Sequence, residues 1–155
     1  MTNPSGFAIE SFHDPLKGRT IVYHVTKLIE FCYGHRLTHY EGKCRHLHGH
    51  NGRVEIELKG DGLDPRGMLI DFGEIKRTMK AWIDENLDHR MILKADDPLA
   101  DALRALDQPV TTIGENPTAE ALARLIFAKA REFGLPVSAV RMWETSDSCA
   151  TYTGD

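Results

Sequence analysis

Histidines are concentrated in one stretch of the sequence, with a spacing suited to metal binding. Four of the eight histidines lie between positions 39 and 50. His48 and His50 are two residues apart in an alternating segment, so we expect both side chains on one face of a strand. His35 has the parity of Ile29 in the preceding apolar segment. If the two strands are neighbours, the three imidazoles meet at one end of a sheet.

Three neutral imidazoles suit Zn²⁺, and they leave the fourth tetrahedral position open for water or substrate. An open position indicates catalysis rather than a structural role. Two alternatives are hydrogen-bonded core histidines and a solvated histidine-rich loop. His39 and His46 fit neither strand parity. We expect both on the loop surface, with a structural or substrate-contact role as the second option.

The three cysteines differ in their sequence neighbours. Cys44 lies between Lys43 and Arg45, and nearby cations and a metal favour a thiolate. It could be a catalytic group, an inert thiol or a fourth zinc ligand, although structural zinc sites usually have two or more closely spaced cysteines. Cys32 and Cys149 lack such neighbours and are predicted to be structural.

Two further features indicate proton transfer or ligand recognition. The dipeptide Asp88-His89 follows a predicted helix, where it is either a helix-end partner or a proton shuttle in which the carboxylate orients the imidazole. Glu144 shares the parity of Val140 and Met142. A carboxylate on a buried face needs a partner, either an arginine or a ligand with N–H groups.

The apolar pattern predicts an α+β domain that positions these groups. We expect strands over 23–36 and 46–59, a helix over 73–87, and a loop over 88–115 with a short helix over 99–106. Asn116 as N-cap and Pro117 as first residue open a second helix, and strands over 137–144 and 149–153 close the domain. The order β-β-α-α-β-β predicts an antiparallel sheet with two helices on one face. Residues 1–22 are predicted to be an irregular extension and 23–155 the domain.

Composition excludes several classes of protein. A chain of 155 residues fits one domain, and a formal net charge of -4 argues against a nucleic-acid binder. Apolar runs fall short of the roughly 20 residues of a membrane span, and no secretory signal opens the chain. Three cysteines cannot all pair within the chain, which predicts reduced thiols and a cytoplasmic protein.

Six segments in order resemble one family of enzymes. FCYGHRL, GKCRHLHGHN, GMLIDFGEIK, LDHRMIL, ENPTAE and WETSDSCATY are similar to the 6-pyruvoyltetrahydropterin and 6-carboxytetrahydropterin synthases. The resemblance covers about residues 25–152. It implies the tunnelling fold, or T-fold, in which three subunits close their sheets into a barrel, two trimers form a hexamer, and the sites lie between subunits.

The resemblance also implies roles for individual residues. Zinc would be held by His35, His48 and His50. Cys44 matches the catalytic cysteine, and Asp88 with His89 matches a proton relay. Glu144 matches the glutamate that anchors the pterin ring, and Thr118 and Glu120 match a stretch that lines the pterin pocket. Two departures concern the pocket lining: the family usually has two alanines where this chain has Tyr33-Gly34, and often an aromatic residue in place of Gly52.

The implied reaction converts 7,8-dihydroneopterin triphosphate to 6-carboxy-5,6,7,8-tetrahydropterin for deazapurine (queuosine-type) biosynthesis. The alternative product is 6-pyruvoyltetrahydropterin, on the tetrahydrobiopterin pathway. Two other classes are a zinc-stabilised oligomeric binding module without turnover and a zinc hydrolase. A binding module would not need Cys44, Asp88 and His89, and a hydrolase would leave Glu144 without a role.

Overall fold

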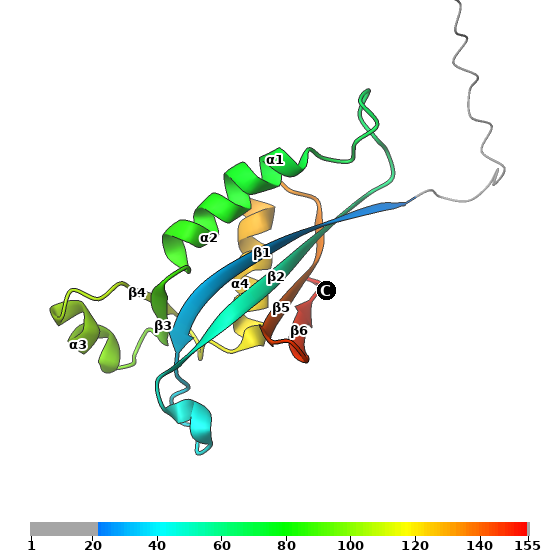
Figure 1. The fold of residues 1–155 in the computed structure, drawn as a ribbon. Helices are drawn as coiled ribbons and strands as arrows, with labels where there is room; N and C mark the ends of the chain where they lie inside the picture. The colour runs from blue at the N-terminus through cyan, green and yellow to red at the C-terminus, as the bar shows by residue number, and fades with distance from the viewer. Residues whose placement is uncertain (1–21, 155) are drawn as a thin grey trace, which may run out of the picture.

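The computed structural model describes residues 22–154, and its longest feature is an antiparallel hairpin (Figure 1). Strand β1 (Tyr23–His35) pairs with β2 (His48–Gly60) along its whole length, with His35 opposite His48. Alternate side chains are buried from Ile29 to His35 on β1 and from Gly52 to Leu58 on β2, as predicted from their apolar parity. The predicted N-terminal extension, residues 1–22, lies outside the described residues except for Val22.

Six strands form one sheet in the order β4-β3-β1-β2-β5-β6. The predicted closing hairpin consists of β5 (Val137–Thr145) and β6 (Ser148–Tyr152), and β5 pairs antiparallel with β2. On the other edge, β3 (Arg90–Lys94) runs parallel to β1, and β4 (Val110–Ile113) runs parallel to β3. The sheet is therefore mixed, and the prediction of an antiparallel sheet was wrong.

The parallel strands lie within the segment predicted as a loop. They have five and four residues, too few for an apolar alternation to be visible in the sequence. Between them lies α3 (Leu99–Ala105), which confirms the short helix predicted over 99–106. The observed order thus adds β3, α3 and β4 between the two long helices of the predicted order.

Two helical segments cover one side of the sheet (Figure 1). The first comprises α1 (Phe72–Ile75), a π-helical segment (Lys76–Lys80) and α2 (Ala81–Asn86), in agreement with the helix predicted over 73–87. The second is α4 (Ala119–Glu132). Both contribute apolar side chains to a single core with the inward face of β1, β2 and β5. Among residues 22–154, no helix is long and apolar enough to cross a membrane.

Helix α4 begins two residues later than predicted. Its N-cap is Thr118, whose hydroxyl accepts a hydrogen bond from the Ala121 amide at 3.3 Å. Asn116 does not cap the helix because its side chain is bonded to Thr38 of the loop after β1. Its Oδ1 accepts from the Thr38 amide at 2.9 Å, and its Nδ2 donates to the Thr38 carbonyl at 2.9 Å. These bonds tie the start of α4 to the end of β1.

Candidate metal centre and the cavity beside it

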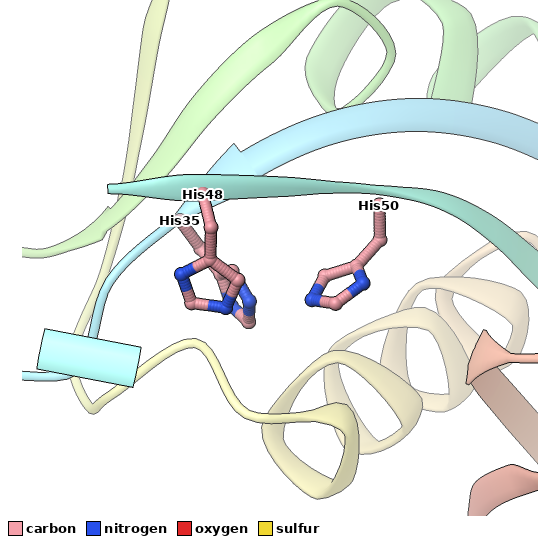
Figure 2. Close-up of side chains that lie close together, drawn as sticks. All are labelled: His35, His48 and His50. Carbon is pink, nitrogen blue, oxygen red and sulfur yellow. The ribbon is translucent and has the colours of Figure 1, made fainter. Parts of the chain in front are cut away.

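The three predicted metal ligands converge at one end of the hairpin (Figure 2). The ring centroids lie 4.4 Å apart for His35 and His48, 5.0 Å for His35 and His50, and 5.1 Å for His48 and His50. One nitrogen of each ring lies within 4.8 Å of the other two. The side chains thus form a group that could hold a metal ion, with the ligand type and number of an open zinc site. His39 and His46 are exposed, as predicted.

Hydrogen bonds to carbonyl groups orient two of these rings. His35 Nδ1 donates to the Pro117 carbonyl at 2.7 Å, and His48 Nδ1 donates to the His46 carbonyl at 2.8 Å. Since a carbonyl can only accept, each ring carries its proton on Nδ1 and keeps the Nε2 lone pair for a metal. His35 Nε2 is buried and has no hydrogen-bond partner. Burial lowers the pKa of His35, which favours the neutral, ligating form.

A cavity of about 210 Å³ adjoins the histidines. His35 lines it, together with four other predicted site residues: Cys44, Thr118, Glu120 and Glu144. Cys44 is half-buried in the short 3-10 turn between β1 and β2. Glu144 lies near the end of β5, and its Oε1 is 3.9 Å from His35 Nε2. One candidate metal ligand, His35, therefore shares a single space with the thiol and the carboxylate within one chain.

The partner of the Glu144 carboxylate is Tyr33, which the sequence did not reveal. The Tyr33 hydroxyl donates to Glu144 Oε1 at 3.1 Å, and the side chain of Glu144 is 27% exposed. Burial and the neighbouring carboxylate raise the pKa of Tyr33, so the hydroxyl stays protonated and remains a donor. In residues 22–154, no arginine forms an ion pair with Glu144. The remaining acceptor capacity of the carboxylate faces the cavity.

Tyr33 occupies space that a residue at position 52 would otherwise fill. The Tyr33 ring stacks on Phe31 and lies 5.2 Å from the His35 ring, centroid to centroid. A Cβ atom on Gly52 would lie 2.9 Å from Tyr33 Cε1 and 2.8 Å from Met142 Cε. At these separations a side chain at position 52 would require Tyr33 and Met142 to shift. The ring of Tyr33 on β1 therefore fills space beside position 52 of β2.

Asp88 and His89 do not line the cavity of Cys44 and Glu144 within one chain. They lie in the turn between α2 and β3, where His89 Nδ1 is 2.8 Å from Asp88 Oδ2. His89 lines a second cavity of about 700 Å³, together with Cys32, His48 and His50. The Asp88 amide donates to the Ile83 carbonyl of α2 at 2.9 Å, while its side-chain Oδ1 accepts from the Cys32 amide at 2.8 Å. The predicted base and the predicted relay are thus in different cavities.

The structure corrects the prediction for the other two cysteines. Cys32 and Cys149 are exposed rather than buried structural thiols. Cys32 alternates with Tyr33 and His35 along β1, so it points to the opposite face of the sheet. Cys149 lies on β6 and lines the smaller cavity beside Cys44.

Comparisons with known proteins agree with this arrangement. Residues 24–155 match the family described as 6-pyruvoyl tetrahydropterin synthase. The chain is 43% identical over 100 residues to a 6-carboxy-5,6,7,8-tetrahydropterin synthase of Rickettsia conorii, covering 63% of this chain and 72% of that protein. A protein of the same name from Synechocystis is 35% identical over 133 residues, covering 83% and 91%. The solved 6-pyruvoyl tetrahydropterin synthase of Caenorhabditis elegans superposes with a TM-score of 0.66 at 25% identity, covering 88% and 99%.

Proposed function

This chain belongs to the 6-pyruvoyl tetrahydropterin synthase family and has its T-fold, and from that premise we propose that it is a zinc-dependent lyase. The proposed reaction converts 7,8-dihydroneopterin triphosphate and one water molecule to 6-carboxy-5,6,7,8-tetrahydropterin, acetaldehyde and triphosphate. The observation that carries the proposal is the shared cavity of His35, Cys44 and Glu144, in which a buried ligand nitrogen lies 3.9 Å from a carboxylate oxygen. Curated relatives that bear the name of the carboxy synthase support this product over the pyruvoyl product.

Different residues of this chain would bind the metal, bind the pterin and transfer protons. His35, His48 and His50 would hold zinc, which acts as a Lewis acid toward the side-chain hydroxyls of the substrate. Glu144 accepts hydrogen bonds from the amino and ring N–H groups of the pterin, with Thr118 and Glu120 beside it. Cys44 as thiolate removes a proton from the substrate side chain on the zinc side.

The second proton-transfer group comes from another copy of the chain. His89, oriented by Asp88, does not reach the cavity of Cys44 in its own subunit. A complete site therefore needs two copies, which supports a homo-oligomer, a trimer or hexamer, with sites between subunits. The sheet ends in β4 on one side and β6 on the other, and each has a free edge within the chain that a neighbouring subunit can pair with.

Product analysis tests the function. The zinc-loaded protein is incubated with 7,8-dihydroneopterin triphosphate, and the products are identified by mass spectrometry. We expect 6-carboxytetrahydropterin and acetaldehyde. Formation of 6-pyruvoyltetrahydropterin instead would show that the chain is a 6-pyruvoyltetrahydropterin synthase. Recovery of unreacted substrate from metal-loaded oligomer would leave a binding module and refute the lyase.

Cys44→Ala separates catalysis from metal binding in the same assay. Cys44 lines the cavity but completes no ligand set, because the three histidines already converge. We expect the variant to keep its zinc and to lose turnover by about 10²-fold or more, as for a general base. Cys149→Ser is the matched control, since Cys149 lines the same cavity and has no proposed role. Loss of zinc from Cys44→Ala would make Cys44 a ligand.

A further inference from the structure

A second group of potential metal ligands lies where the α2–β3 turn meets β1. One ligand atom each of Cys32, Asp88 and His89 lies within 4.8 Å of the other two. Cys32 comes from β1, whereas Asp88 and His89 lie 56 and 57 positions further along the chain. Thiol, carboxylate and imidazole are the three ligand types that zinc takes in proteins. Nothing in the proposed reaction uses the thiol of Cys32.

Backbone hydrogen bonds hold this group together. The His89 amide donates to the Cys32 carbonyl at 2.6 Å, and the Cys32 amide donates to Asp88 Oδ1 at 2.8 Å. The turn gives His89 a φ of 54°, a left-handed conformation that costs energy for a side chain other than glycine. The surrounding bonds thus fix all three residues in place before any ligand arrives.

The side chains remain accessible to an ion from solvent. The side chain of His89 is 79% exposed, and Cys32 is exposed beside a cavity of about 700 Å³. Burial raises the pKa of Asp88, but hydrogen bonds from the Cys32 amide and the His89 ring outweigh it, and the pKa lies below its ordinary value. Asp88 is therefore an ionised carboxylate. Lys80, whose charge also lowers the pKa of Asp88, is itself paired with Asp84 at 2.6 Å.

We propose that Cys32, Asp88 and His89 form a second, weaker site for a thiophilic divalent cation such as zinc, separate from the three-histidine centre. Ligand atoms around tetrahedral zinc lie about 3.3 to 3.8 Å apart. The three side chains would therefore adjust on binding, and the His89 ring would give up its 2.8 Å contact with Asp88 Oδ2. The Cys32 thiol gives its proton to solvent as the metal–sulfur bond forms. Thiolate and carboxylate together then balance the charge of the ion.

A zinc ion bound at this site would prevent Asp88 and His89 from transferring protons. The carboxylate and imidazole that bind the second ion are the groups proposed to move protons, so zinc beyond the first equivalent should lower turnover. This consequence rests on the proposed function. Occupancy of the site does not, because it depends only on the three side chains and the ion.

Zinc titration of the intact oligomer tests the site. We expect wild type to bind two zinc ions per chain, one tightly and one more weakly. In Cys32→Ser the weaker site should lose at least about 100-fold in affinity, more than the loss of a supporting second-sphere residue usually causes. Cys149→Ser, which changes the other exposed thiol, should bind two ions like wild type. His48→Ala should lose the tight site and keep the weak one.

Cobalt(II) gives an independent readout of the sulfur ligand. A thiolate-to-cobalt charge-transfer band should appear with the second equivalent in wild type and in Cys149→Ser, and should be absent in Cys32→Ser. Binding of only one metal ion per chain in wild type, or unchanged binding of the second ion in Cys32→Ser, would overturn the proposal. If the protein shows no lyase activity, the number of metal ions bound per chain still shows whether the second site exists. If it is active, zinc inhibition in wild type that is lost in Cys32→Ser establishes the regulatory consequence.

Discussion

The buried Nε2 of His35 is the atom on which the metal assignment depends. The Nδ1–H group of its ring donates a hydrogen bond to the Pro117 carbonyl, and the other nitrogen faces two more imidazoles without a hydrogen-bond partner. An unpartnered buried nitrogen is costly, and coordination to a cation removes that cost. A hydrogen-bonded core histidine, the alternative interpretation of the sequence, would have both nitrogens satisfied.

Replacement of one ligand tests this assignment directly. We expect His48→Ala to lose the metal of the three-histidine centre and all activity, while the chain stays folded because its core is large and independent of the metal. Metal analysis of the purified variant and its circular dichroism spectrum give the two readouts. His39→Ala, at an exposed histidine of the neighbouring loop, should retain full metal and activity. Full occupancy in His48→Ala would refute the ligand set.

Glu144 provides the sharpest residue-level test of pterin recognition. Glu144→Gln preserves shape but replaces one acceptor by a donor, which then faces a ligand donor. Loss of a charge-assisted bond of about 1.5 to 3 kcal/mol should weaken binding by roughly 10- to 150-fold. Titration calorimetry with biopterin or sepiapterin measures the affinity of each protein for the pterin, with zinc content as the internal control. Equal affinities of variant and wild type would remove the anchoring role and much of the argument for a pterin ligand.

The role of a single residue could be predicted when the pattern that indicates it lies in the neighbouring sequence. Parity along β1 and β2 was enough to predict that His35, His48 and His50 meet. Tyr33 could not be predicted as the partner of Glu144, because the two are 111 positions apart and only the sheet brings them together. For the same reason the sequence predicts only a structural role for Cys32, since the residues beside it, Asp88 and His89, lie far along the chain.

At the scale of elements, long segments were predictable and short ones were not. The hairpin strands have 13 residues each, and α4 has 14, so their periods of two and 3.6 are repeated many times. Strands β3 and β4 are defined by pairing with β1 and with each other, which no local pattern records. The start of α4 was misplaced because Asn116, a good N-cap by type, is bonded to Thr38.

The corrected start of α4 makes a prediction about stability. Thr118→Ala removes the N-cap and should lower the free energy of unfolding by about 0.5 to 2 kcal/mol, measured by urea denaturation. Thr118→Ser keeps the capping oxygen and should stay within a few tenths of wild type, or about 0.3 kcal/mol. Asn116→Ala should also destabilise the protein, but through the lost bonds to Thr38. A stable Thr118→Ala protein would show that the cap contributes little here.

At the scale of the whole molecule, Cys44 and His89 line different cavities of one chain. We therefore propose that each site takes these two groups from different subunits. The sheet, with one free edge at β4 and another at β6, offers the surfaces for such an assembly.

Mixed oligomers test this arrangement. Cys44→Ala and His89→Ala should each be nearly inactive alone. After the two are dissociated, mixed in equal amounts and reassembled, about one quarter of the sites should carry both intact groups by random combination. A steady-state assay should then recover roughly that fraction of wild-type activity. The same mixture without dissociation is the control. Activity that stays at the single-variant level after exchange would place both groups in one subunit's site.

The pairing of Tyr33 with Gly52 has a consequence for how this sequence can change over generations. Positions 33 on β1 and 52 on β2 border the same space, which has room for one aromatic ring but not for two. A mutation that enlarges position 52 first meets Tyr33 Cε1 at 2.9 Å, whereas one that shrinks position 33 first leaves a hollow and frees Glu144. Either single step is unfavourable. The side chains at positions 33 and 52 are therefore expected to change together rather than one at a time.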